Sequence, residues 1–182
     1  EMILEDHPRL LLFLPLAHVF ARYMQFFCFA GNVSLGLSSN LKTILADFKA
    51  FKPTFILAVP RIFEKIYNAA SQKAGAGFKG RVFADATQTA YDWSHAQQSG
   101  GSIPLALNAK HALYNKLLYS SIMEVFGGHV EYAVSGGAPL DSSIAHFFNG
   151  VGLSLLEGYG MTETCAPSSV NPTEGYKIGT IG

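Results

Sequence analysis

The chain has 182 residues, of which 49% are hydrophobic and 14% are charged, so it can bury a sizeable apolar core. Its 13 Lys and Arg residues balance its 13 Asp and Glu residues, and this neutral charge gives no electrostatic footprint for nucleic acid. The two cysteines, Cys28 and Cys165, lie far apart and lack the spacing of a metal site. They indicate free thiols in a reducing, cytoplasmic compartment.

Residues 10–37 form the first strongly apolar region. Four residues interrupt it, namely Pro15, His18, Arg22 and Asn32, so no window of ~18 uncharged apolar residues is left for a transmembrane helix. A buried strand followed by a buried helix over about residues 19–30 fits the pattern better. Gly31 then ends this helix, and residues 33–37 form a further strand.

From residue 41 onward, the sequence predicts helices and strands in alternation. Helices are expected over residues 41–51 and 61–74, with an apolar strand over residues 54–59 between them. After a glycine-rich break, helical spacing returns from Phe78 to Trp93, and a loop at residues 100–104 precedes another helix over about 106–126. We predict that this pair, near residues 76–126, is a surface excursion between sheet strands. The alternation predicts an α/β fold with parallel strand pairing.

A glycine-rich turn follows the next predicted strand, at residues 130–134. The turn reads Ser135-Gly136-Gly137-Ala138-Pro139-Leu140, and Asp141 is a good start for the helix that includes residues 144–148. A Gly-Gly pair alone usually makes only a turn. A second glycine-rich segment lies about twenty residues further on. In open α/β sheets, ligands collect beyond the carboxyl ends of strands, so we expect both segments to line one crevice.

The second segment is Gly158-Tyr159-Gly160-Met161-Thr162-Glu163-Thr164. Preceding leucines indicate the end of a buried strand, and we expect the two glycines to turn the backbone sharply and let it approach a ligand. Tyr159 offers a flat face for a base, Thr162 a hydroxyl for a phosphate oxygen, and Glu163 a hard oxygen ligand for magnesium. The alternative is an ordinary strand-to-loop turn with an exposed Thr-Glu pair.

Both segments resemble signature sequences of the adenylate-forming superfamily, which includes acyl-CoA synthetases, luciferases and peptide-synthetase adenylation domains. Two more segments are similar to the long-chain fatty acyl-CoA synthetases, Leu14-Pro15-Leu16-Ala17-His18-Val19-Phe20 and Val59-Pro60-Arg61-Ile62-Phe63-Glu64-Lys65-Ile66-Tyr67. The resemblance covers essentially the whole chain. It implies that residues 1–182 are part of one AMP-binding N-terminal domain.

The resemblance also implies a role for individual residues. Tyr159 is expected to stack on adenine, Thr162 to touch the α-phosphate, Glu163 to hold magnesium, and His18 to lie beside the acyl carboxylate. His18, Thr162 and Glu163 are therefore the expected catalytic residues. The expected nucleotide-binding residues are Gly136, Gly137, Ala138, Pro139, Glu157, Gly158, Tyr159, Gly160, Met161 and Thr162, and the expected acyl-substrate residues are His18, Val19, Phe20 and Gly160.

Two observations qualify this interpretation. His18 lies in apolar sequence, where a lone histidine can also be a hydrogen-bonded core residue. In addition, relatives carry a phosphate loop upstream, and a ribose-binding aspartate and a lysine-bearing C-terminal domain downstream, and none of these is found in this sequence. We therefore expect the chain to be a fragment that is inactive alone.

The resemblance implies that the parent protein is an ATP-dependent long-chain fatty acid–CoA ligase. Such an enzyme uses ATP and Mg²⁺ to activate a fatty acid as acyl-AMP and then transfers the acyl group to coenzyme A. A fatty acyl-AMP ligase that delivers to a carrier protein is one alternative. For the excised chain alone, a non-catalytic nucleotide- or lipid-binding module is another. The expected location is the cytoplasm, and peripheral contact with a membrane stays open because a long-chain substrate lives there.

Overall fold

The computed structural model describes residues 7–182. The strands within this range are β1 (Arg9–Leu12), β2 (Ser34–Leu37), β3 (Phe55–Ala58), β4 (Tyr132–Ser135), β5 (Ser154–Met161) and β6 (Ala166–Val170). The α-helices are α1 (Val19–Ala30), α2 (Ile44–Phe51), α3 (Pro60–Ala74), α4 (Phe78–Gln98), α5 (Leu105–Tyr114), α6 (Ser120–Met123) and α7 (Ser142–Val151). Shorter turns are the π-helical η1 (Asn115–Tyr119) and the 3-10 turns η2 (Glu124–Phe126) and η3 (Thr162–Thr164).

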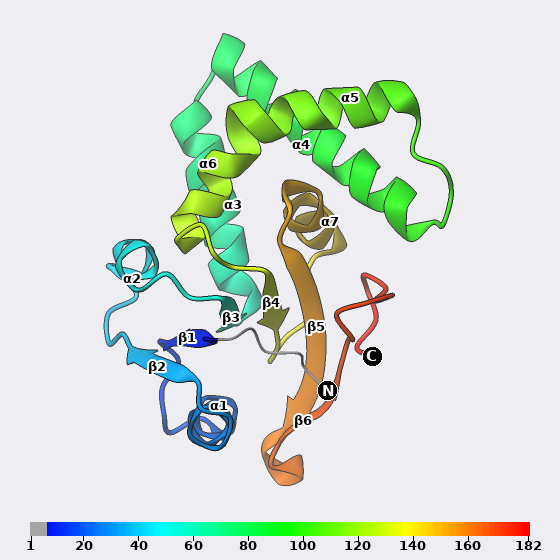
Figure 1. Cartoon of the computed structure of the whole chain (residues 1–182). Coiled ribbons are helices and arrows are strands. Elements are labelled where there is room, and N and C mark those ends of the chain that lie inside the picture. The colour runs from blue at the N-terminus through cyan, green and yellow to red at the C-terminus, as the bar shows by residue number, and fades with distance from the viewer. Residues whose placement is uncertain (1–6) are drawn as a thin grey trace.

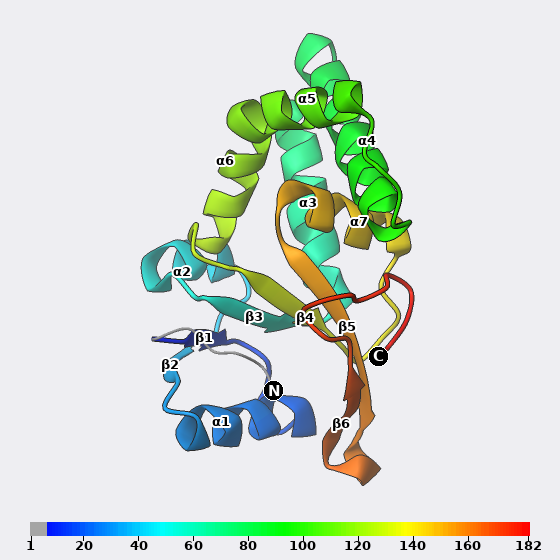
Figure 2. The same cartoon turned by 45° about the vertical axis from the view of Figure 1, so that its right-hand side comes forward.

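The strands form one sheet in the order β2-β1-β3-β4-β5-β6. The first five strands pair in parallel, as the sequence predicts, and β6 pairs with β5 in the antiparallel direction. Figures 1 and 2 show α1 on one face of the sheet and helices α3 to α7 beyond the other. The predicted α/β class is therefore confirmed.

Alternation along the strands divides the apolar core between the two faces of the sheet. Ile56 and Ala133 belong to the larger cluster, which the helices α3, α4 and α7 complete. Their neighbours Phe55 and Val134 belong to a smaller cluster that includes Met24 of α1. Successive side chains of a strand point to opposite faces, so both faces of a central strand must be apolar when both are covered.

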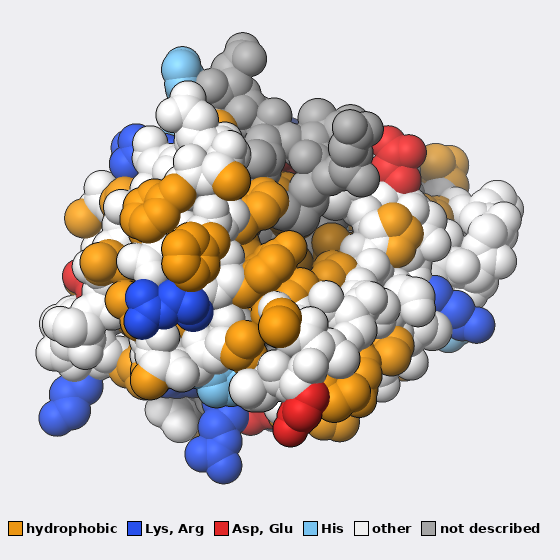
Figure 3. Space-filling view, turned by 90° about the horizontal axis from the view of Figure 1, so that it is seen from below, with side chains coloured by type: hydrophobic (Ala, Val, Ile, Leu, Met, Phe, Trp, Pro, Cys, Tyr) orange, Lys and Arg blue, Asp and Glu red, His pale blue; other side chains and the backbone are white. Residues whose placement is uncertain are grey.

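The face covered by α1 remains partly open. Tyr23, Phe26 and Phe29 of α1 are 42%, 63% and 67% exposed, and Figure 3 shows hydrophobic side chains gathered across this side of the molecule. Both cysteines are free thiols, as expected, with Cys28 buried in α1 and Cys165 exposed. Among the described residues, no helix combines the length and the apolar character needed to cross a bilayer.

The predicted helical excursion near residues 76–126 lies between β3 and β4, and both of its helical segments have an exposed side. One side of α4 is buried through Phe83, Ala86, Thr89, Ala90 and Ser94. It packs closely on α7, where a Cβ on Gly150 would lie only 2.1 Å from the carbonyl oxygen of Ala90. Residues 105–126 are helical throughout, as predicted, with the π-helical turn η1 joining α5 to α6 and the 3-10 turn η2 at the end.

Candidate functional site

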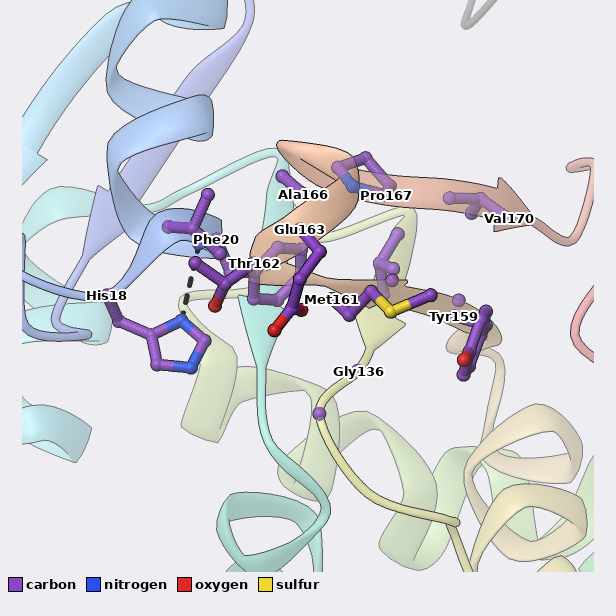
Figure 4. A pocket seen from close by; sticks show the side chains of 15 residues that line it. His18, Phe20, Gly136, Tyr159, Met161, Thr162, Glu163, Ala166, Pro167 and Val170 are labelled. Carbon is purple, nitrogen blue, oxygen red and sulfur yellow. Dashed lines mark hydrogen bonds between the residues drawn. The ribbon is translucent and has the colours of Figure 1, made fainter.

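A pocket of about 260 Å³ lies where three segments meet: the start of α1, the turn after β4, and the outer part of the β5–β6 hairpin. Figure 4 shows His18 and Tyr159 on opposite sides of it, with Thr162, Glu163 and Met161 between them in that view. The expected site residues that line it are His18, Val19, Phe20, Gly136, Gly137, Gly158, Tyr159, Gly160, Met161, Thr162 and Glu163. The structure therefore brings together residues that are more than a hundred positions apart in the sequence.

Some residues depart from the expected set. Ala138, Pro139 and Glu157 do not line the pocket, whereas four residues that were not expected do: Val134, Ala166, Pro167 and Val170. Three of these four come from the antiparallel strand β6, a strand that is not among those expected from the sequence. Its short sequence contains a proline and lacks an apolar alternation, so it gives no recognisable strand signal.

The expectation of a sharp turn at Gly158 and Gly160 is wrong. Strand β5 continues through both glycines to Met161, and neither glycine has a positive φ. Gly160 is needed for another reason, because a Cβ there would lie 2.2 Å from the carbonyl oxygen of Ala166. The pairing of β5 with β6 also shifts register between Tyr159 and Gly160, as in a β-bulge. Glycine thus permits close approach of a partner strand here.

The tip of the hairpin presents two polar side chains to the pocket. Thr164 holds the tip, since its Oγ1 accepts from the Met161 N–H at 3.3 Å and lies 3.1 Å from the Ala166 carbonyl oxygen, to which it donates. The chain then passes through positive φ values at Cys165 and Ala166, a strained conformation typical of functional loops. Within residues 7–182, the side chains of Thr162 and Glu163 form no hydrogen bond or ion pair and so stay available to a ligand.

His18 is the N-cap of α1 and is exposed rather than buried in the core. Its Nδ1 accepts a hydrogen bond from the backbone N–H of Phe20 at 3.3 Å. When Nδ1 is an acceptor in the neutral ring, the proton is on Nε2, so His18 can donate from Nε2. The positive end of the α1 dipole lies at the same place. This corner of the pocket therefore suits an anionic group.

The turn after β4 forms the facing wall. The Gly136 N–H donates to the Ala58 carbonyl at 3.1 Å, and Gly137 has a φ of +84°, which favours glycine. Helix α7 begins at once, with the Asp141 carboxylate accepting from the Ser143 N–H at 2.8 Å. Hydrogen bonds from the Ser143 side chain and backbone lower the pKa of Asp141. The turn is thus fixed at both ends, by β3 and by the helix cap.

Glu157 stabilises the turn from behind. Its Oε1 accepts from the Leu140 N–H at 3.4 Å, and its Oε2 accepts from the Gly179 N–H at 3.0 Å. The backbone carbonyl of Glu157 also accepts from the Asn171 N–H at 2.9 Å. Both carboxylate oxygens are therefore engaged by backbone groups, which explains why Glu157 does not line the pocket.

The pocket has the right chemistry for a phosphate-bound magnesium ion but not for a metal held by protein alone. The described residues contain no cluster of three or more His, Cys, Asp or Glu side chains that could hold a metal. Mg²⁺ usually binds one or two carboxylates together with substrate phosphates and water. Glu163 fits that mode as a single, unengaged carboxylate beside the Thr162 hydroxyl.

The chain is similar to known ligases along its whole length. It is 46% identical over 180 residues to the long-chain-fatty-acid–CoA ligase FadD15 of both Mycobacterium bovis and Mycobacterium tuberculosis, an alignment that covers 99% of this chain and 30% of each relative. It is 33% identical to long chain acyl-CoA synthetase 3 of Arabidopsis thaliana, over 93% of this chain and 25% of that protein. The chain thus spans less than a third of these relatives.

Solved structures share the fold. O-succinylbenzoate coenzyme A synthetase from Bacillus subtilis, solved with ATP and magnesium ion, matches with a TM-score of 0.60 at 16% identity, over 100% of this chain and 28% of that chain. The A domain of a carboxylic acid reductase from Segniliparus rugosus, solved with AMP, also has a TM-score of 0.60, at 23% identity over 89% of this chain and 22% of its own. The family of AMP-binding enzymes matches all of residues 1–182, and the chain belongs to that family.

Proposed function

We propose that this chain is part of an ATP-dependent long-chain fatty acid–CoA ligase, and that residues 1–182 belong to its AMP-binding N-terminal domain. The observation that carries the proposal is the convergence of His18, Tyr159, Thr162 and Glu163 on one pocket. The 46% identity to long-chain-fatty-acid–CoA ligases supports this choice among AMP-binding enzymes.

The proposed reaction has two steps. In the first, a carboxylate oxygen of the fatty acid attacks the α-phosphorus of ATP, the bond to pyrophosphate breaks, and acyl-AMP forms. In the second, the thiol of coenzyme A loses its proton to solvent, its sulfur attacks the acyl carbon, and the bond to AMP breaks. The first step needs no general base, because a carboxylic acid is already ionised at neutral pH. The protein must instead position two anions and offset their repulsion.

The resemblance to adenylate-forming enzymes implies the proposed roles, and the pocket supports them because these residues line it together. Tyr159, with 48% of its surface exposed, presents a ring on which adenine can stack. Thr162 donates to an α-phosphate oxygen, and His18 donates from Nε2 where the two anions meet. Glu163 would hold Mg²⁺, which supplies charge neutralisation for the phosphates. Val19, Phe20 and Gly160 then contact the acyl end.

The described pocket is smaller than a complete site. Small-molecule sites usually enclose about 300–1,000 Å³, whereas this one encloses about 260 Å³. We therefore propose that the rest of the parent chain supplies the other contacts to ATP and coenzyme A. Peripheral contact with a membrane, where long-chain fatty acids partition, is part of the same proposal.

Glu163→Gln in the full-length parent protein tests the proposal. We expect fatty-acid-dependent pyrophosphate exchange at saturating magnesium to fall by roughly one to three orders of magnitude. Glu174→Gln is the matched control, because Glu174 is exposed and outside the pocket, and it should leave exchange unchanged. Wild-type exchange in a folded Glu163→Gln variant would remove Glu163 from the site.

Product analysis separates the proposed ligase from its alternative. Supplying the wild-type protein with palmitate, ATP, magnesium and coenzyme A should yield palmitoyl-CoA and AMP. Accumulation of palmitoyl-AMP without thioester would favour a fatty acyl-AMP ligase that delivers to a carrier protein.

A further inference from the structure

The outer side of α5 and η1 carries an exposed apolar face far from the pocket described above. Leu105, Leu113 and Leu117 are 85%, 55% and 65% exposed. The alanines between them, at positions 106, 109 and 112, are exposed as well. Residues three or four apart share one side of a helix, so these side chains form a continuous stripe. We call it the α5 outer face.

The opposite side of the same helix is anchored to the body of the protein. Lys110 forms an ion pair with Asp85 at 2.8 Å, and the Tyr114 hydroxyl donates to the same carboxylate at 2.5 Å. One turn on, the buried Tyr119 donates to the carbonyl of Ala86 at 2.7 Å. Figures 1 and 2 show α5 on the outside of the helical layer, away from the sheet. The leucines are therefore exposed because the fold fixes this orientation.

The charge around the α5 outer face is one-sided. The cations of α5 and η1 are Lys110, which is paired with Asp85, and Lys116. No acidic residue occurs from Trp93 to Met123. Lys116 lies among the exposed leucines in the chain and is itself exposed. The surface thus combines apolar side chains with positive charge.

The start of α4 adds a second exposed apolar residue with a basic neighbour. Phe78 is 81% exposed, and Lys79 follows it. Both line an apolar pocket of about 570 Å³ together with Leu118 and Ser121. Because Leu118 follows Leu117 directly, this part of α4 adjoins the α5 outer face.

We propose that the α5 outer face, with Phe78 and Lys79 beside it, docks on the surface of an anionic lipid bilayer. Exposed apolar side chains flanked by Lys and Arg are what an interfacial helix needs, since the apolar groups enter the headgroup boundary while the cations face anionic lipids. A second copy of the chain fits less well, because a two-fold contact through this face would bring its Lys116 side chains together. This inference specifies the surface for the membrane contact proposed above and rests on that part of the proposed function.

The test is co-flotation of the full-length parent protein with vesicles of phosphatidylcholine alone or mixed with phosphatidylglycerol. We expect binding to the anionic vesicles and little binding to the neutral ones. Leu105→Ser/Leu113→Ser/Leu117→Ser should reduce the bound fraction at least about tenfold, because three apolar groups no longer leave water. Lys79→Glu/Lys116→Glu should reduce it by a similar factor at low salt and have no effect with neutral vesicles.

Controls keep the result interpretable. Asn115→Ser changes an exposed polar residue of the same helical segment and should bind vesicles like the wild type. Should the triple variant fail to fold, Leu105→Ser alone at the exposed end of α5, together with the Lys pair, provides the same comparison. Pyrophosphate exchange should be unchanged in all these variants, because none of the residues lines the first pocket.

The outcomes separate this inference from the proposed ligase activity. Loss of flotation with intact exchange supports the docking surface. Equal flotation of the wild type and both multiple variants overturns it, whatever the enzymatic result. The same is true if sedimentation shows a wild-type dimer that the leucine variant abolishes while flotation is absent. If flotation behaves as expected but no fatty acid is activated, the surface stands and the proposed reaction fails.

Discussion

Gly160→Ala should disrupt the candidate site more than any other single methyl group added to it. A Cβ at this position would lie 2.2 Å from the Ala166 carbonyl oxygen and 2.8 Å from both the Ala166 carbonyl carbon and the Pro167 Cα. All three are backbone atoms of β6, so no side-chain rotation relieves the contact. Ordinary van der Waals contact needs about 1 Å more, and the two strands must separate by a comparable distance.

The loss of stability in Gly160→Ala is limited because the hairpin can open locally. Overpacking typically costs about 1–3 kcal/mol, and the β5–β6 hairpin can open at its outer end without unfolding the sheet. We therefore expect the full-length protein to lose about 1–3 kcal/mol of stability. Activity should suffer more, because the hairpin carries Tyr159, Thr162 and Glu163.

Pyrophosphate exchange and thermal unfolding measure the two effects. We expect exchange to fall by at least two orders of magnitude, since a displacement of about 1 Å is enough to misplace catalytic groups. Gly101→Ala is the matched control, because nothing lies within 4 Å of its Cβ and its φ is not positive. Gly158→Ala should be intermediate, with a closest contact of 3.2 Å to the Val170 side chain. Wild-type exchange in Gly160→Ala would refute the close-approach argument.

Three other predictions concern single side chains. Tyr159→Ala should raise the KM for ATP more than the KM for fatty acid, because ATP binding loses about 1–3 kcal/mol of free energy if the ring stacks on adenine. Tyr159→Phe should be tolerated, and equal losses in the two variants would show that the hydroxyl matters instead. Lys52 has a φ of +54° at the end of α2, so Lys52→Gly should stabilise the protein by about 0.5–1 kcal/mol in urea unfolding, whereas Lys49→Gly within α2 should destabilise it by about 1 kcal/mol. A change of the same sign in both variants would contradict the strain argument. Burial, and to a lesser extent the neighbouring His95, lower the pKa of His146. The folded state therefore disfavours the protonated ring, and the free energy of unfolding should fall as the pH drops below about 6.5. His146→Gln should flatten this pH dependence, and an unchanged slope would exclude His146 as its source.

The sequence predicts the parallel part of the fold well because local signals and tertiary environment agree there. Strands β3 and β4 are short apolar runs that need both faces covered, and the structure covers both. Asp141 is the helix cap that its position before α7 suggests. At these places the periodicity of the sequence and the burial of the side chains have the same physical cause.

The errors occur where tertiary contacts decide the local conformation. Gly158 and Gly160 suggest a turn by composition, yet the partner strand β6 keeps them extended. Two backbone N–H groups occupy the carboxylate of Glu157, which no local pattern indicates, and its contact with the nucleotide stays a prediction. The apolar spacing of α4 predicts a buried side, but it does not reveal that this side packs on α7, about fifty residues away in the chain. The roles of Tyr159, Thr162 and Glu163 stay predictions, which the variants above examine.

The separation of His18 from the rest of the pocket in the sequence has a consequence for folding. Strands β4 and β5, helix α7 and the hairpin are contiguous in the chain and can form through short-range contacts. His18 joins them only after β1 has paired with β3 and β3 with β4 across the long helical excursion. Long-range pairing is slow, because the entropy of loop closure is lost before the contacts form. The part of the pocket formed by β4, β5 and the hairpin should thus form early, and the corner at His18 should form only when the sheet is complete.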